Sequence, residues 1–437
     1  MTERIYSRLM RRVPAAEEEL PEEVRRNVPH NGLRLVGAQA LQSSGDQTVN
    51  ASTVLPWLFH ALGVPTALIG VLVPIRESGS MLPQALLTPW ILGVRRRKWV
   101  YVLGALVQAV AVAVMALTAA VGHGVTAGVV IIVALAAFSL GRCLTSVSSK
   151  DVQGQTVPKG ERGQINGLAT TASGIVSITL GLAVRTLGGG DLTGAQLAWL
   201  LGLGSALWVL VALVYAGVRE PADVSERTEQ DVDAQGWFAE VVTLLRTDRA
   251  FRDFVLVRGF LLVSSLSPPF VVSLSVRSDT SALTGLGGYI LASGVAALIG
   301  GRLFGRMADR SSRRLMTVGA GVASGLVLVL VLLVTLTGIE GTALGSVVFV
   351  VTYFLLTLTH TGVRVGRKTY VVDMAEGDLR TTYVAVSNSA MGLVLLLVGG
   401  ISSAIATLGT EWALVFLAAL GLLGVLGSVR LPEVSRG

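Results

Sequence analysis

Long uninterrupted apolar runs constrain this chain more than any other feature of its sequence. The runs 99–120, 315–336 and 391–408 each approach the roughly 20 residues that a helix needs to cross a bilayer. Hydrophobic residues make up 52% of the chain and charged residues 14%, which excludes an ordinary soluble domain. Backbone polar groups in lipid are satisfied inside helices, so the runs predict embedded helices and exclude a β-barrel of short alternating strands.

Hydropathy predicts twelve crossings, six in each half of the chain. The expected spans are 33–62, 66–93, 99–120, 126–147, 164–186, 196–217, 251–276, 284–304, 315–337, 344–365, 383–407 and 412–430. The predicted fold is an all-α membrane protein with twelve transmembrane helices in two pseudo-symmetric six-helix bundles, residues 32–217 and 251–430. Residues 1–31 and 431–437 are predicted tails, and the linker 218–250 is predicted to contain an amphipathic helix on the inner membrane surface.

The two halves share residues at one constant spacing. Three residues of the first half recur 218 positions later in the second: Lys150, Arg162 and Gly174 match Lys368, Arg380 and Gly392. The chain therefore reads as two copies of one unit. In membrane proteins, duplicated halves are typical of transporters whose binding site lies between the halves.

Basic residues predict the orientation of the chain. They fall in alternate loops on one side: Arg95, Arg96, Arg97, Lys98, Lys150, Lys159, Arg162, Arg310, Arg313, Arg314, Arg367, Lys368 and Arg380. By the positive-inside rule, these loops and both termini are expected in the cytoplasm, with the chain in the plasma (inner) membrane. The net charge of +7 is then a topology signal, and nucleic-acid binding is the weaker explanation. No signal peptide is visible in the first 30 residues.

One segment carries a more specific pattern, G-x-x-A-D-R-x-x-R-R, which is expected in a cytoplasmic loop. Its residues are Gly305, Ala308, Asp309, Arg310, Arg313 and Arg314. The glycine permits close helix approach, and an acid between arginines can bind a neighbouring helix end in one conformation and release it in another. A loop that is basic only for topology is the alternative, although topology requires neither the glycine nor the aspartate.

The motif, the twelve expected crossings and the 218-residue repeat together resemble the major facilitator superfamily from about residue 32 to residue 430. The family's loop signature maps onto Gly305, Asp309, Arg310, Arg313 and Arg314. In the first half, only the basic end of that signature remains, at Arg95 and Arg96. The resemblance implies two six-helix bundles around a central cavity with alternating access, and it leaves the substrate open.

Ionisable residues inside membrane spans are costly unless paired or hydrated, which makes them functional candidates. Asp46 is expected near the midplane of the first crossing, on a polar face of side chains at three- or four-residue spacing: Gln39, Gln42, Asp46, Asn50 and Thr53. Arg76 and Glu77 lie at a similar depth in the second crossing. We expect Asp46 to pair with Arg76, leaving Glu77 to exchange protons. Permanent neutralisation of the three charges is the alternative.

Further cations are expected in the cytoplasmic half of the membrane and would suit an anionic substrate. For Arg142 and Arg364, snorkelling to the interface is the favoured interpretation, whereas Arg258 is deeper and a better binding candidate. The predicted substrate-binding set is Arg258, Gln42, Asn50, Arg142, His360 and Asn388.

The first functional hypothesis is a proton-driven secondary transporter that moves a small organic solute between its two halves, with Asp46 and Glu77 carrying the proton and Arg76 tuning them. A uniporter or organic-anion exchanger of the same fold is the second, and a membrane sensor or assembly protein is the third. An enzyme is not expected, because neither a nucleotide-binding loop nor a nucleophile constellation appears. The single cysteine and the four histidines show no metal-binding spacing, so neither a metal nor another cofactor is expected. The predicted partners are the solute, protons and lipid, with a monomeric protein.

Overall fold

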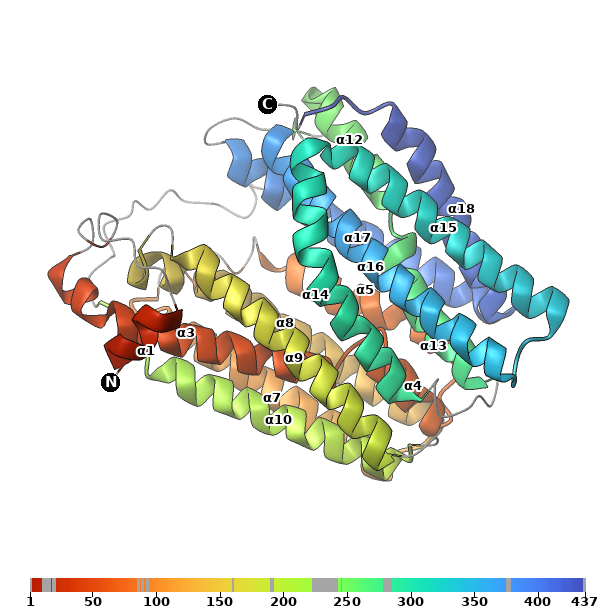
Figure 1. Ribbon diagram of the computed structural model, residues 1–437, viewed down its shortest axis with the longest axis horizontal. Coiled ribbons are helices and arrows are strands. Elements are labelled where there is room, and N and C mark those ends of the chain that lie inside the picture. Colours follow the sequence, from red (N-terminus) through yellow and green to blue (C-terminus); the bar gives the residue numbers. More distant parts are fainter. Residues whose placement is uncertain are drawn as a thin grey trace.

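The structure is a computed structural model that describes residues 2–9, 17, 21–84, 87, 90–91, 94–158, 161–188, 192–221, 243–244, 246–277, 285–374 and 379–434. Within these ranges the regular elements are all helical (Figure 1). Eight helices are long and apolar enough to cross a membrane, and 174–184 and 286–300 are shorter apolar helical stretches. The predicted all-α membrane fold is confirmed, while the count of twelve crossings stays a prediction.

The helices fall into two similar series. The first half contains α1 (Thr2–Leu9), α3 (Glu22–Thr48), α4 (Val54–Ala61), the 3₁₀ helix η1 (Thr66–Val71), α5 (Leu72–Met81), α7 (Lys98–Val121), α8 (Gly124–Thr156), α9 (Arg162–Gly188) and α10 (Gly194–Ala216). The second half contains α12 (Arg249–Phe260), α13 (Val263–Arg277), α14 (Leu286–Arg310), α15 (Ser312–Thr337), α16 (Ala343–Met374), α17 (Leu379–Ile405) and α18 (Thr410–Val429). Adding 218 to the bounds of α8 and α9 reproduces those of α16 and α17 to within one residue.

The first two predicted crossings are each divided in two. Between α3 and α4, the Asn50 side chain accepts the Ser52 N–H at 2.8 Å, a local turn that competes with the helix. The prediction of one continuous helix over 33–62 is therefore wrong beyond Thr48. In the second crossing, Pro74 offers no N–H to the Gly70 carbonyl, and the segment before it forms the 3₁₀ helix η1.

Two helices extend further than hydropathy predicts. Helix α8 ends at Thr156 and α16 at Met374, about nine residues beyond the predicted ends at 147 and 365. Hydropathy detects only the apolar part of a helix, whereas hydrogen bonding continues through polar residues that extend past the membrane. Arg142 consequently lies fourteen residues before the end of its helix, a rise of about 20 Å.

The segment 305–314 is a tight helix-to-helix junction and not the predicted loop. Helix α14 continues through Arg310, and the Ser311 hydroxyl then accepts the Arg314 N–H at 3.1 Å as the N-cap of α15. Arg313 donates to the Leu431 carbonyl at 2.8 Å and pairs with Glu433 at 3.6 Å. Arg313 thereby ties α15 to the segment after α18.

Other residues of this region differ in what the structure shows. The side chain of Arg310 is exposed, whereas the burial of Gly305 and the side chain of Asp309 lie outside what the structure describes. Most of the predicted linker helix, including residues 237–242, also lies outside them. The domain boundaries and the switching role of the motif stay predictions.

The two halves form separate groups of helices that diverge toward the ends carrying the two termini and converge at the opposite ends (Figure 1). At the converging ends, His60 Nε2 lies 3.1 Å from the Ser273 carbonyl, and the Ser403 hydroxyl donates to the Ala67 carbonyl. An added Cβ at Gly70 would lie only 2.9 Å from the Ser403 Cα, so glycine is required for this approach. We call these contacts between the halves the seam.

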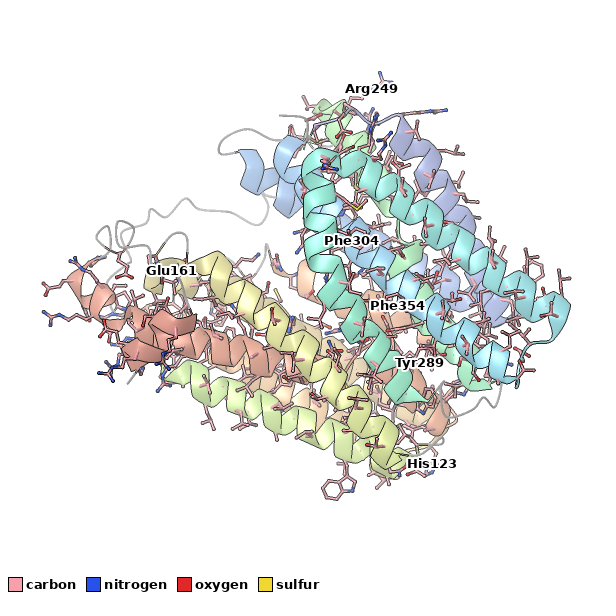
Figure 2. The ribbon with its side chains drawn as sticks, in the orientation of Figure 1. His123, Glu161, Arg249, Tyr289, Phe304 and Phe354 are labelled. Atoms are coloured by element: carbon pink, nitrogen blue, oxygen red, sulfur yellow. The ribbon has the colours of Figure 1, made fainter. Side chains whose placement is uncertain are left out.

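Side chains show the same asymmetry between the two ends of the molecule. Glu161 and Arg249 lie at the diverging ends of the first and second halves, far apart, whereas Tyr289 lies near the converging end (Figure 2). There, Tyr289 of α14 packs against Trp57 of α4 with ring centroids 6.4 Å apart. The two halves therefore contact one another at the seam and lie farther apart on the side of the termini.

Candidate functional site

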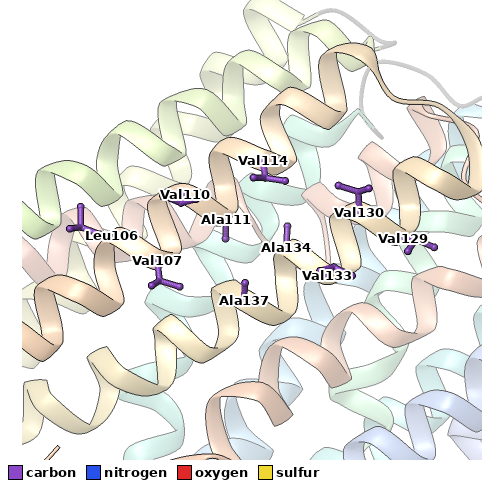
Figure 3. A pocket seen from close by; sticks show the side chains of 10 residues that line it. All are labelled: Leu106, Val107, Val110, Ala111, Val114, Val129, Val130, Val133, Ala134 and Ala137. Carbon is purple, nitrogen blue, oxygen red and sulfur yellow. The ribbon is translucent and has the colours of Figure 1, made fainter.

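Two cavities differ sharply in chemistry. An apolar groove of about 580 Å³ lies between α7 and α8 and is lined only by leucine, valine and alanine (Figure 3). Val110 and Val133 are exposed there, as expected of a surface that faces lipid chains. The other cavity, of about 320 Å³, is polar and includes residues of both halves: Ser43, Asp46, Gln47, Asn50, Arg76, Glu77, Ser80, Arg142 and Arg364. Its size suits a small solute, and we treat it as the candidate site.

Asp46 of α3 lies between two arginines that other helices supply. Its Oδ1 is 3.2 Å from Arg76 Nη2 of α5, and its Oδ2 is 2.6 Å from Arg142 Nη1 of α8. The three side chains are 15%, 20% and 30% exposed, respectively, so the cluster is mostly shielded from water. Charge-assisted hydrogen bonds of this kind are stronger than neutral ones and join three helices at one point.

The expected contact between Asp46 and Arg76 is present, but the expectation that Arg142 snorkels is wrong. Arg142 reaches Asp46 because α8 is longer than hydropathy predicts, so the guanidinium lies deep and far from the helix end. The carboxylate thus carries one negative charge against two positive charges. The roles of these residues in proton coupling stay predictions.

Glu77 follows Arg76 on α5 and also lines the cavity. Consecutive helical residues point about 100° apart, so Glu77 cannot share the position of Arg76 beside Asp46. Its carboxylate makes no hydrogen bond or ion pair with the described part of the chain. Arg142 and Arg367 are nonetheless close enough to attract it electrostatically.

The polar face of α3 is rotated from the one predicted. Ser43, Asp46 and Gln47 face the cavity, together with Asn50 of the following turn. Gln42 does not line it, because its Oε1 accepts the Tyr101 hydroxyl at 2.5 Å from α7. Thr53, the last member of the predicted face, is buried.

Arg258 of α12 does not line the polar cavity but is buried beside α17. It donates to the Ser387 hydroxyl and, at 3.1 Å, to Asn388 Oδ1. Its Nε has no hydrogen-bond partner, and the whole residue is only 7% exposed. The Asn388 side chain thus accepts a bond between helices, and the Arg258 charge has no carboxylate partner among the residues described.

His360 and two arginines share one helix, α16. The Ser264 hydroxyl lies 3.4 Å from His360 Nδ1, which leaves His360 hydrogen-bonded across to α13. Arg364 is exposed, lines the polar cavity and makes no ion pair within the described ranges, so its predicted snorkelling stays a prediction. Arg367 is 9% exposed, and its Nε lacks a hydrogen-bond partner.

Sequence reasoning missed Arg367 as a site residue because it placed this arginine in a cytoplasmic loop. A signal was present: Arg364 and Arg367 are three residues apart, which puts both on one face if the helix continues. The extension of α16 to Met374 supplies that continuation.

Comparison with known proteins decides the family. The sequence profile of the Major Facilitator Superfamily matches residues 36–350. The chain belongs to this superfamily. It is accordingly a membrane transporter and not an enzyme, and the resemblance seen in the sequence is confirmed.

Solved superfamily structures share the fold at low sequence identity. A POT family transporter in complex with 5-aminolevulinic acid has a TM-score of 0.70 and 10% identity, covering 91% of this chain and 95% of its own. A D-xylose-proton symporter has a TM-score of 0.67 and 12% identity, with coverages of 93% and 98%. The nucleoside transporter NupG has a TM-score of 0.63 and 13% identity, with coverages of 92% and 98%. No match was found among curated protein sequences.

Proposed function

We propose that this superfamily member is a proton-coupled secondary transporter of a small organic solute. The solute binds in the polar cavity, and the two halves rock about it to expose the cavity to one side at a time. The observation that carries the proposal is a cavity lined from both halves, in which the carboxylate of Glu77 lies among arginines and forms no ion pair with the described residues. A D-xylose-proton symporter of similar fold supports the coupling by analogy.

The shape of the molecule suggests the direction in which this conformation is open. The diverging ends carry the basic residues of the junction 310–314, and the positive-inside rule puts such ends in the cytoplasm. The conformation is then the inward-facing one, with the seam closing the outer side. Closure of the cytoplasmic ends and separation of the seam would complete the cycle.

Within this cycle Glu77 carries the proton, and Asp46 holds the cluster together. Asp46 is already bound by two guanidinium groups, so protonating it would leave both without their counter-charge. Glu77 forms no ion pair with the described residues, so a proton can neutralise it without breaking one. Movement of the second half changes the distance between Glu77 and the arginines of α16, which changes the free energy of its charged form.

The test uses purified protein in liposomes with an imposed pH difference and a pH-sensitive dye inside. Solutes from a panel of small sugars, nucleosides, peptides and organic acids are added one at a time. A coupled solute should move protons with it in the wild type. Replacing Glu77 with Gln should abolish proton movement while solute exchange continues, whereas Glu23→Gln, at an exposed position on α3, serves as the control and should change neither.

A uniporter or exchanger of the same fold gives a different result. Solute would then equilibrate across the membrane while internal pH stayed constant. Glu77→Gln would not change the rate or the extent of solute movement. That outcome would refute the proton coupling and retain the transporter.

A further inference from the structure

Among the described residues, the second half holds positive charge in the membrane without a matching negative charge. Arg258 and Arg367 are 7% and 9% exposed, and neither forms an ion pair within the described ranges. Each also has an Nε without a hydrogen-bond partner. A buried charge without a counter-charge costs several kcal/mol, so a structure that retains two of them is incomplete without an anion.

These charges lie close together and extend to the cavity wall. Arg258 and Arg367 repel one another, and Arg367 and Arg364 do so as well. Arg364 lines the polar cavity, where its guanidinium is available to a solute. The positive electrostatic potential of the buried arginines therefore extends to the cavity wall at Arg364.

The described carboxylates of the first half do not balance this positive charge. Its Asp46 is bound by Arg76 and Arg142, which leaves that cluster with a net positive charge. Besides Asp46, the cavity lining contains one carboxylate, that of Glu77, and three arginines. The lining is thus positive overall even with both carboxylates ionised.

We infer that the solute is an organic anion, with a carboxylate, sulfonate or phosphate group that binds Arg364 at the cavity wall while Arg367 and Arg258 stabilise its charge from behind. This inference rests on the proposed transport function and specifies its substrate class. Arginine suits the role because its planar fork binds two oxygens of such a group at once. Arg364 is the binding residue, and Arg367 acts through its charge.

The test measures binding to the purified full-length protein in detergent at constant ionic strength. Succinate is compared with succinamide, which is similar in size but neutral, and sulfate serves as an inorganic probe. Succinate and sulfate should raise the melting temperature saturably, and succinamide should not. Arg364→Gln should increase the half-saturating concentration about tenfold or more, because a charge-assisted contact is lost.

Two further variants separate binding from structure. Arg252→Gln removes an arginine from the same helix as Arg258, but one that has Asp253 beside it and is 43% exposed, so anion binding should not change. Arg367→Gln should raise the melting temperature of the ligand-free protein, because it removes an uncompensated charge, and should weaken anion binding. An arginine with a purely structural role would instead destabilise the protein when replaced.

Failure of the inference is distinct from failure of the proposed function. Equal binding of succinamide and succinate, no saturable shift with succinate or sulfate, or unchanged binding in Arg364→Gln would overturn the inference. Uptake of a neutral solute alone into liposomes would also overturn it, while transport would stand. Saturable anion binding without uptake of any solute would support the inference and contradict the transport function.

Discussion

The two halves of the molecule place different chemistry at equivalent positions. The 218-residue repeat relates Asp46 to Ser264 and Arg142 to His360. In the first half these positions form an ion pair of 2.6 Å, and in the second half a hydrogen bond of 3.4 Å between neutral groups can form. The same helical arrangement therefore occurs twice, once with a carboxylate that pairs with an arginine and once without that carboxylate.

This difference explains where the solute is expected to bind. The first half pairs its own arginines, Arg76 and Arg142, with Asp46, which leaves one net positive charge in place of two. The second half has a serine at the matching position, and among the described residues its arginines Arg258, Arg364 and Arg367 form no ion pair. A carboxylate in one half and a serine at the matching position of the other are enough to divide the two tasks.

The largest expected effect comes from removing the carboxylate of the first half. Asp46→Ala leaves Arg76 and Arg142 without a counter-charge and should destabilise the protein by about 3 kcal/mol, measured by unfolding in detergent. Ser264→Ala, at the matching position, should cost about 1 kcal/mol or less, because only a neutral hydrogen bond is lost. Equal losses in the two variants would contradict the comparison between the halves.

Adding a carboxylate to the second half should have the next largest effect. Ser264→Asp places a negative charge beside His360 and near the arginines of α16, whereas Ser264→Asn adds the same volume without charge. We expect the Asp variant to be more stable than the Asn variant by about 2 kcal/mol. It should also bind succinate more weakly, since the new side chain competes for the same cations. A less stable Asp variant would show that this half is not short of negative charge.

A smaller effect is expected at a contact that only the first half possesses. Tyr101→Phe removes the hydroxyl that Gln42 accepts and should cost about 1 kcal/mol in unfolding experiments. Tyr215 is stacked on Tyr101 but has a hydroxyl without a partner, so Tyr215→Phe is the matched control and should be neutral or stabilising. A greater loss in Tyr215→Phe would indicate a hydrogen bond that this conformation lacks.

The smallest change in stability is expected at Glu77, whose counterpart in the second half is Val295. Because its carboxylate has no partner in the described structure, Glu77→Gln should alter the free energy of unfolding by no more than about 0.5 kcal/mol. Thermal melting in detergent would measure it. A large destabilisation would assign Glu77 a structural role and remove it as the proton carrier.

Much of the fold could be predicted from the sequence because bilayer thickness sets helix length. The apolar runs located the helices, and the repeat predicted that α16 would resemble α8. Helix ends were less predictable. The break after Thr48 arises from a side-chain hydrogen bond of Asn50, and the 3₁₀ helix before Pro74 from a missing N–H, neither of which hydropathy detects.

The candidate site was predictable in part. Charge and depth pointed to Asp46 and Arg76, which are in contact. The errors at Arg142 and Arg367 share one cause, since both helices were taken to end too early, which placed Arg142 near the surface and Arg367 in a loop. Gln42 was predicted to bind the substrate but instead accepts the Tyr101 hydroxyl. A polar helix face shows which side chains need partners, but not whether water or a tyrosine provides them.

The seam has an electrical consequence. Its hydroxyl and imidazole groups contact backbone carbonyls, His60 also lies 3.3 Å from the Ser273 hydroxyl, and no ion pair of the described residues crosses the seam. Moving one elementary charge through the whole membrane potential is worth about 2.3 kcal/mol per 100 mV. Separating the seam breaks no ion pair and displaces little charge. Its opening and closing should therefore respond only weakly to voltage. Any current would arise from the ions that the cavity carries.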